Sequence, residues 1–186
     1  MKTVNPVKDK AQIAEIEKLL RRFNTSPIYG DLWVFLNQTA ARISDALSLR
    51  YSDFQNLDSN VLSLREKKTG KTRSILLTAK ALELVAERRA ANPGHVYLFE
   101  VDSNRAKGKP ISRVTVSTKF KEAGDRLGLH VAAHTPRKNL GYHALKRGVS
   151  LPTLTKLYGH SSQSITLAYV GIMESDVADV FSGIDY

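Results

Sequence analysis

The chain has 186 residues, no cysteine, and 28 Lys plus Arg against 18 Asp plus Glu, which gives a formal net charge of +10. The length suits a single domain. The lack of cysteine excludes disulfides, thiolate nucleophiles and cysteine-ligated zinc. No apolar run approaches the roughly 18 residues of a membrane span, so we expect a basic, cytoplasmic protein whose leading partner is nucleic acid.

The first half of the sequence predicts helices and one hairpin. Apolar residues recur with a helical period over residues 8–22, 29–39 and 43–49. Two β-prone runs, 61–64 and 73–77, flank a turn that contains Gly70, and this arrangement predicts a β-hairpin. Thr78 is a plausible N-cap for a further helix that ends before Asn92.

The second half is predicted to be helical apart from a loop over residues 106–110. Residues 117–127 form one predicted helix, and Thr135 is expected to cap the next, with Pro136 in its first position. Gly159 can end a helix in left-handed geometry, and a serine after it can cap a last helix that reaches Tyr169. The predicted fold class is mainly α with a small antiparallel sheet.

The charge is unevenly distributed along the chain. Residues 65–73 hold five bases and one acid, whereas residues 170–186 hold four acids and no base. This asymmetry favours a body that binds a polyanion and a tail that avoids it. The alternative is two solvated faces of opposite charge.

Three short motifs could bind phosphate or react with it. His134 and Arg137 flank a predicted helix N-terminus, where free backbone N–H groups favour anions. His160 follows Gly159 at a helix junction, and Tyr169 lies nine residues further on. Taken singly, each motif is also compatible with a capped helix, a structural histidine or a core tyrosine.

Taken together, the motifs resemble the tyrosine recombinase (phage integrase) family. The resemblance includes Arg42-Ile43-Ser44-Asp45, a lysine in a hairpin, His-x-x-Arg, Gly-His and a tyrosine, in that order, and covers residues 10–172. It implies the catalytic-domain fold of that family. It also implies a site-specific recombinase that cleaves and rejoins DNA through a 3′-phosphotyrosyl intermediate, as in integration, excision or inversion.

The resemblance also implies a role for each matching residue. Tyr169 matches the nucleophile, and Arg42 and Arg137 match the pair that holds the non-bridging phosphate oxygens. His134 matches the position that assists proton transfer, and His160 the position that hydrogen-bonds the phosphate. Lys68 matches the hairpin lysine that protonates the leaving 5′-oxygen. No cofactor or metal is expected, because cationic side chains supply the positive charge.

Further residues are expected to support this site. The expected DNA-binding bases are Lys67, Lys71, Arg73 and Lys138. Asp45 is either a carboxylate that supports an active-site cation or a plain acid on a helix surface. The sequence departs from the usual family pattern at Ala40, where glycine is common, and at Ala168, where arginine is frequent.

The expected organisation is one catalytic domain over residues 1–186, without a separate N-terminal core-binding domain. Residues 173–186 form a predicted amphipathic tail helix. The expected partners are double-stranded DNA and further copies of the chain, as a tetramer on paired sites, with accessory DNA-bending proteins possible. The expected setting is the cytoplasm of a bacterium, with the protein encoded there or by a phage and associated with the nucleoid.

Two other functions fit parts of the sequence. Residues 145–166 could form a helix-turn-helix in a non-enzymatic regulator, although that function leaves Arg42, Lys68 and the His-x-x-Arg motif unexplained. A type IB topoisomerase would share the chemistry, but such proteins are usually much larger.

Overall fold

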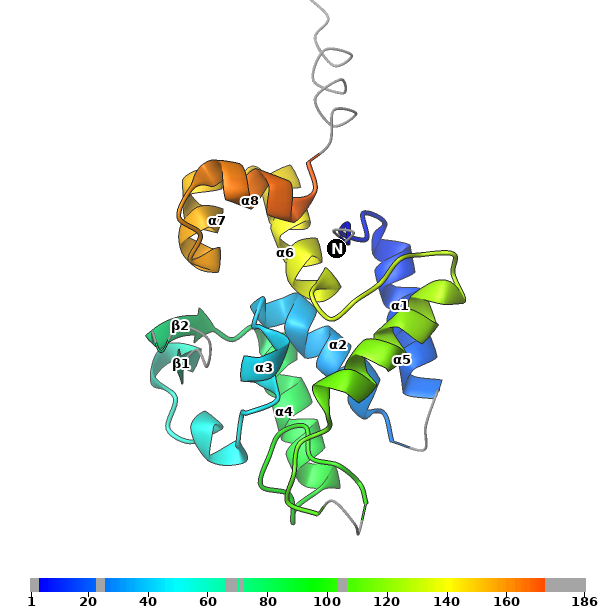
Figure 1. The fold of residues 1–186 in the computed structure, drawn as a ribbon. Coiled ribbons are helices and arrows are strands. Elements are labelled where there is room, and N and C mark those ends of the chain that lie inside the picture. Colours follow the sequence, from blue (N-terminus) through cyan, green and yellow to red (C-terminus); the bar gives the residue numbers. More distant parts are fainter. Residues whose placement is uncertain (1–3, 23–25, 66–69, 71, 104–106, 173–186) are drawn as a thin grey trace, which may run out of the picture.

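Helices make up most of the computed structural model, and a two-stranded antiparallel sheet lies at their edge (Figure 1). The structure describes residues 4–22, 26–65, 70, 72–103 and 107–172. The helices are α1 (Lys10–Arg22), α2 (Ile28–Thr39), α3 (Ile43–Ala46), α4 (Ala79–Ala91), α5 (Arg113–Asp125), α6 (Thr135–Lys146), α7 (Leu151–Tyr158) and α8 (Gln163–Val170). Two 3-10 turns, Tyr51–Phe54 and Asp58–Asn60, lead into the sheet, in which β1 (Val61–Arg65) pairs with β2 (Thr72–Leu76). The predicted fold class, mainly α with a small antiparallel sheet, is confirmed.

Helix α2 forms the centre of the fold and is buried on nearly all sides. Its sequence, IYGDLWVFLNQT, places apolar side chains all around the helix axis, a pattern typical of a helix enclosed by others. It contacts α1, α4, α5 and α6, which Figure 1 shows arranged about it. The C-terminal end of α2 therefore gives a fixed position from which the next segment starts.

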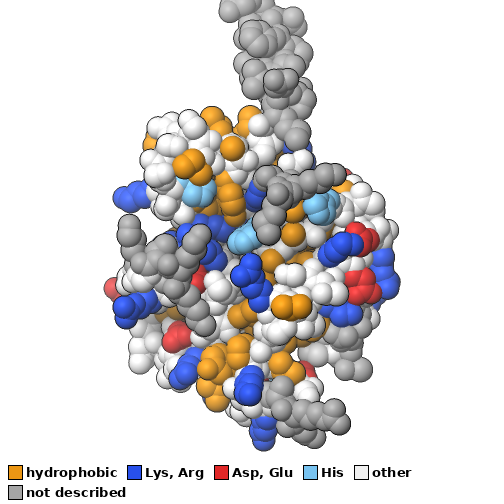
Figure 2. All heavy atoms as spheres, in the orientation of Figure 1, with side chains coloured by type: hydrophobic (Ala, Val, Ile, Leu, Met, Phe, Trp, Pro, Cys, Tyr) orange, Lys and Arg blue, Asp and Glu red, His pale blue; other side chains and the backbone are white. Residues whose placement is uncertain are grey.

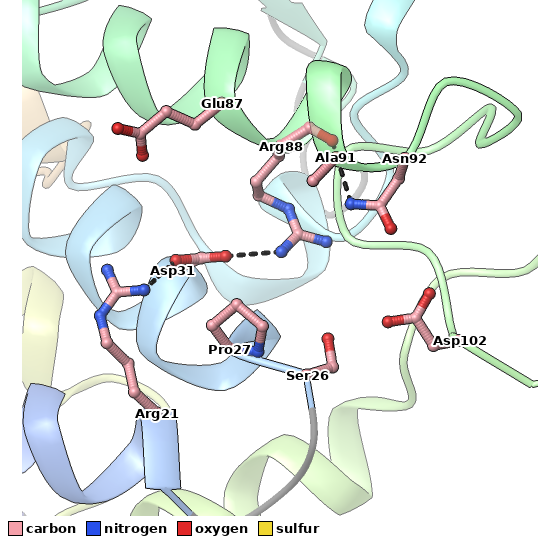
Figure 3. A pocket seen from close by; sticks show the side chains of 9 residues that line it. All are labelled: Arg21, Ser26, Pro27, Asp31, Glu87, Arg88, Ala91, Asn92 and Asp102. Atoms are coloured by element: carbon pink, nitrogen blue, oxygen red, sulfur yellow. Dashed lines mark hydrogen bonds and ion pairs between the residues drawn. The ribbon is translucent and has the colours of Figure 1, made fainter.

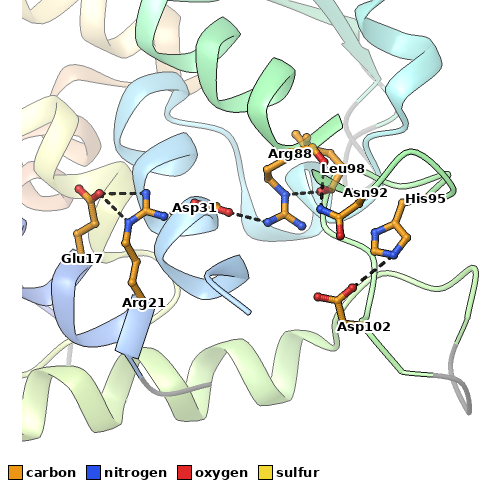
Figure 4. A network of polar contacts seen from close by, with 8 residues as sticks. All are labelled: Glu17, Arg21, Asp31, Arg88, Asn92, His95, Leu98 and Asp102. Carbon is orange, nitrogen blue, oxygen red and sulfur yellow. Dashed lines mark hydrogen bonds and ion pairs between the residues drawn. The ribbon is translucent and has the colours of Figure 1, made fainter. Parts of the chain in front are cut away.

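A buried carboxylate on α2 ties three helices together (Figures 3 and 4). Asp31 Oδ1 accepts a hydrogen bond from Arg21 Nη1 of α1 at 2.5 Å, and Asp31 Oδ2 accepts one from Arg88 Nη1 of α4 at 2.6 Å. Arg88 Nε also donates to the Leu98 carbonyl at 2.8 Å. Arg88 and Asp31 are both buried, so their charges depend on each other for compensation.

We expect Asp31→Asn to lower the free energy of unfolding by about 3–5 kcal/mol, because it leaves Arg88 charged, buried and without its carboxylate. Urea denaturation followed by circular dichroism measures this change. The matched control is Asp125→Asn, which breaks an exposed pair with Lys121 and should cost less than about 1 kcal/mol. Equal effects of the two substitutions would contradict the importance of the buried network.

The described residues form two hydrophobic clusters in the interior. The larger cluster includes side chains from α1 to α5 and from the sheet. The smaller one contains Ala40, Leu154, Tyr158 and Val170, with partly buried residues of α6, α7 and α8 packed against it. Ala40 directly follows α2, so the two clusters meet at the end of that helix.

Several predicted element boundaries are confirmed. Thr78 accepts a hydrogen bond from Ala81 N and caps α4, which ends at Ala91. Gly159 ends α7 with φ +67°, and Ser162 caps α8 by accepting from Ile165 N at 3.3 Å. The hairpin strands pair as expected, with Leu62 opposite Ile75.

Other boundaries were predicted wrongly. Thr135 is not the cap of α6 but its first residue, and Pro136 is in the second position. The Thr135 hydroxyl instead accepts from Ala132 N at 2.9 Å, within the preceding turn. Helix α5 begins at Arg113 rather than at residue 117, because the Ser112 side chain caps it by accepting from Thr115 N.

The helix predicted over residues 43–49 ends at Ala46. The predicted tail helix over residues 173–186 lies outside the described residues. Among the residues that the structure describes, no helix is both long and apolar enough to cross a bilayer.

Candidate active site

Arg42 is placed by the turn between α2 and α3. It occupies the N-cap position of α3 with extended backbone, and its side chain is 21% exposed. The Asp45 carboxylate lies one turn further along, with Oδ2 4.0 Å from Arg42 Nη1. Asp45 is only 1% exposed, so it is not a surface acid but the carboxylate that accompanies the Arg42 guanidinium.

Arg137 lies in the first turn of α6 and is buried. Its Nη1 donates to the Ala40 carbonyl and its Nη2 to the Tyr158 carbonyl, the latter at 3.2 Å. Both carbonyls belong to helix C-terminal ends, whose partial negative charge favours a cation. Burial lowers the pKa of Arg137 to about 10, which still leaves the group charged at neutral pH.

His160 and Tyr169 come together because α8 folds back on α7. The Gly159 and Ser162 caps set the sharp turn between the two helices. The two rings are 5.1 Å apart between centroids, in an edge-on arrangement, and His160 Nδ1 lies 3.0 Å from Thr166 Oγ1. Thr166 therefore fixes the orientation of the imidazole beside the Tyr169 ring.

The electrostatic surroundings of Tyr169 keep its hydroxyl protonated. Burial raises the pKa of Tyr169 above its ordinary value, although the charge of Arg137, a hydrogen bond to Arg137 and the charge of Arg42 oppose this rise. A phenol in this state needs a base to react as a nucleophile. The two guanidinium groups that oppose the rise in this pKa, those of Arg42 and Arg137, lie 95 residues apart in the chain.

Both histidines of the site favour the neutral form. Burial lowers the pKa of His134, and the positive charges of Arg113, Arg137, Lys138 and Arg42 lower it further. The pKa of His160 is lowered first by burial and then by the same two guanidinium groups, those of Arg137 and Arg42. A neutral imidazole can accept a proton from a neighbouring hydroxyl.

Two of the expected DNA-binding bases are engaged inside the protein. Arg73 of β2 donates from Nη1 to the Leu157 carbonyl at 3.0 Å and from Nη2 to the Ala40 carbonyl at 3.4 Å. Lys138 is buried, with its ammonium 4.9 Å from the centroid of the Tyr169 ring. The hairpin residues Lys67, Lys68 and Lys71 lie outside the described residues.

The site thus brings together Arg42, His134, Arg137, His160 and Tyr169, which the sequence predicted, and adds groups that it did not. The additions are the Ala40 carbonyl, the Thr166 hydroxyl and the Tyr158 ring. Ala40 has φ +50°, which is uncommon for a residue other than glycine, and it stands at the position where the family pattern commonly has glycine. Figure 2 shows basic and histidine side chains gathered across the middle of the face that it presents, between α6–α8 and the rest of the helices.

This arrangement can bind and polarise an anionic ester. Two guanidinium groups offer planar, charged donors, and the Tyr169 hydroxyl is hydrogen-bonded to one of them. The His160 imidazole lies beside the Tyr169 ring. In the ranges that the structure describes, no cluster of three or more His, Asp or Glu side chains is arranged to bind a metal ion.

Comparison with known proteins identifies similar chains. A family model described as the phage integrase family matches residues 10–175. The probable integrase/recombinase YoeC of Bacillus subtilis is 35% identical over 175 residues, which are 94% of this chain and 93% of YoeC. The tyrosine recombinase XerA of Pyrococcus furiosus is 31% identical over 160 residues, which are 85% of this chain but only 55% of XerA.

The fold is also found in a solved structure. A crystal structure of a lambda integrase dimer bound to a COC′ core site superposes with a TM-score of 0.70 and 20% identity, over 91% of this chain and 49% of that one. At this level of identity the likeness concerns the fold alone. It matches the helical architecture with its small sheet described above.

Proposed function

Because this chain belongs to the phage integrase family of tyrosine recombinases, we propose that Tyr169 is the nucleophile with which it cleaves and rejoins DNA. The observation that carries the proposal is that the Tyr169 ring lies 5.1 Å from the His160 ring and its hydroxyl is hydrogen-bonded to Arg137. The hydroxyl attacks a phosphodiester, the 5′-oxygen leaves, and a 3′-phosphotyrosyl ester remains. A 5′-hydroxyl then attacks this ester and reseals the strand, so no external energy source is needed.

The remaining site residues supply charge and proton transfer. Arg42 and Arg137 hold the two non-bridging oxygens, on which negative charge increases in the transition state. His134 accepts the proton of the attacking hydroxyl, and His160 donates a hydrogen bond to the phosphate. The lowered pKa of His134 supports the first of these roles, because only the neutral imidazole can accept a proton.

Lys68 protonates the leaving 5′-oxygen in this scheme, and Lys67 and Lys71 bind the DNA backbone beside it. Replacement of that oxygen by sulfur gives a leaving group that needs no proton. The cleavage defect of Lys68→Ala should therefore be largely rescued on a 5′-bridging phosphorothiolate substrate. Equal impairment on both substrates would remove Lys68 from this role.

The proposed partners are double-stranded DNA and further copies of the chain. The net charge of +10 supports the first, since a basic protein gains affinity by releasing counterions from phosphates. The lambda integrase of similar fold was solved as a dimer on DNA, which supports assembly on DNA here. Strand exchange between two sites needs four nucleophiles, so the proposed recombining form is a tetramer.

Covalent capture tests the proposed function directly. A nicked suicide substrate loses a short oligonucleotide after cleavage, so the protein remains attached to the DNA and migrates slowly in a denaturing gel. A non-enzymatic regulator would bind the same DNA and give no adduct. Relaxation of supercoils without exchange of partners would indicate a topoisomerase instead.

The lowered pKa values of both histidines predict the acid limb of the pH profile. Each imidazole stays neutral to a lower pH than an ordinary histidine, so kcat/KM for cleavage should fall only below pH 6.5, with its midpoint under that value. Single-turnover rates at subsaturating DNA report the groups of the free protein. His134→Gln is expected to abolish or shift this limb, and a wild-type midpoint above 6.5 would contradict the assignment.

A further inference from the structure

Tyr158 occupies the middle of the active site although the chemistry does not use it. It is the last residue of α7 and is fully buried. Its ring lies 4.7 Å from the Arg137 guanidinium, stacks on the His160 ring at 5.3 Å between centroids, and lies 5.2 Å from the Tyr169 ring. A single side chain thus contacts three groups of the proposed reaction.

Tyr158 and Arg137 are also joined through their main chains. The Tyr158 hydroxyl donates to the Arg137 carbonyl at 2.8 Å, while Arg137 Nη2 donates to the Tyr158 carbonyl at 3.2 Å. Each side chain therefore binds the other residue's backbone. Rotation of the Arg137 side chain would break its buried hydrogen bond to the Tyr158 carbonyl, so the guanidinium stays over the ring.

Gly141 provides the space that Tyr158 needs. It lies one turn after Arg137 on the same face of α6, and a Cβ atom at this position would clash with the Tyr158 hydroxyl and lie 2.7 Å from Val170 Cγ1. Glycine is unfavourable in the interior of a helix, so its presence here needs a reason in the packing. The close approach of the tyrosine is that reason.

We propose that Tyr158 is a positioning residue that sets the orientation of the Arg137 guanidinium toward the scissile phosphate and aligns His160 and Tyr169 on the same ring. The inference rests on the proposed function, because it requires Arg137 to hold a phosphate oxygen. The aromatic face is the part that acts, since it attracts a cation whose other sides are bound to carbonyls. Burial raises the pKa of Tyr158, which keeps its hydroxyl a hydrogen-bond donor and not a second nucleophile.

Two substitutions separate the ring from the hydroxyl. Tyr158→Phe keeps the aromatic face and should cleave within about threefold of the wild-type rate. Tyr158→Leu removes that face and should slow single-turnover cleavage by about tenfold to a hundredfold, with DNA affinity nearly unchanged. A phenylalanine variant as slow as the leucine variant would overturn the proposal.

A second substrate shows whether the defect acts through Arg137. A methylphosphonate at the scissile position replaces a charged non-bridging oxygen with a methyl group, so orientation of the guanidinium toward that oxygen no longer matters. On this substrate, wild type and Tyr158→Leu should differ by less than about twofold. An equal defect on both substrates would overturn the proposal, because it would indicate general loss of packing.

Tyr142→Leu is the matched control for packing. Tyr142 is a buried tyrosine on α6 whose ring contacts His143 and the ammonium groups of Lys8 and Lys146. Its replacement should lower the melting temperature and slow cleavage of both substrates by the same factor. A preference for one substrate in this control would remove the specificity of the test and overturn the proposal.

Gly141→Ala serves if Tyr158→Leu does not fold, as judged by circular dichroism. The added methyl group displaces the ring without removing it, so the charged substrate should again be affected more than the methylphosphonate. Wild-type cleavage of both substrates by Gly141→Ala would overturn the proposal. If wild type forms no covalent adduct on the phosphodiester, the proposed function itself fails, and that outcome is distinct from those above.

Discussion

Tyr169→Phe should bind DNA as wild type does and form no covalent protein–DNA product. The substitution removes one oxygen atom and keeps the ring that packs beside His160 and Tyr158, so the fold and the basic surface are retained. Without the hydroxyl there is no atom to form the phosphotyrosyl bond, and the expected loss is complete. The measurement is adduct formation on a nicked suicide substrate, with affinity taken from a gel-shift titration.

The matched control is Tyr142→Phe, which removes the same atom from another buried tyrosine of the seven in the chain. It should form the adduct at a rate close to that of wild type. Adduct formation by Tyr169→Phe would mean that a different tyrosine reacts, and the assignment of the whole site would then be wrong.

Arg137→Lys should slow cleavage by about a hundredfold to a thousandfold, a size typical of the loss of one donor to a developing charge. Lysine keeps the positive charge but loses the planar fork that binds the Ala40 and Tyr158 carbonyls while it reaches the phosphate. DNA affinity should change little, because many other bases contribute to it. Single-turnover rates at saturating DNA measure the effect.

Arg126→Lys is the control for the arginine-to-lysine exchange itself. Arg126 is an exposed residue at the end of α5 that pairs with Glu122, away from the reacting groups. Its replacement should leave cleavage unchanged. A rate for Arg137→Lys within a few-fold of wild type would show that charge alone is sufficient at this position.

The sequence was informative where a local rule determines the structure. The Thr78, Gly159 and Ser162 boundaries follow from cap chemistry that involves only residues within a few positions of each other. The reacting groups could be named because they match a family pattern in which order and spacing are fixed. Neither prediction required knowledge of how distant segments pack.

The sequence was uninformative where the determining contact joins distant segments. Arg73 and Arg137 bind the same Ala40 carbonyl from positions 33 and 97 residues away, and no local pattern indicates that an alanine carbonyl will accept both. The role of Gly141 follows from the packing of Tyr158 of α7 against α6, which the local sequence does not indicate. The sequence predicts Lys138 as a DNA-binding base, whereas its burial depends on the packing of α8, which carries Tyr169 to its ammonium group.

The start of α5 was missed for a more local reason. Helix α5 starts four residues before the predicted position, although the β-branched residues after Ser112 lower the helix propensity of this stretch. The capping hydrogen bond and the burial of Val116 outweigh that preference.

The two hydrophobic clusters meet at Ala40, so the thermal stability of the active site differs from that of the rest of the fold. The two neighbours of Arg42 in the chain, Ala41 and Ile43, belong to the large cluster. Tyr169 packs against the small cluster, which has four fully buried members. The guanidinium bonds to the Ala40 carbonyl hold the two parts together at this junction. On warming, we expect the smaller unit to detach first, because it has less buried surface to lose. Cleavage should therefore be lost at temperatures where the circular dichroism of the helices is still intact.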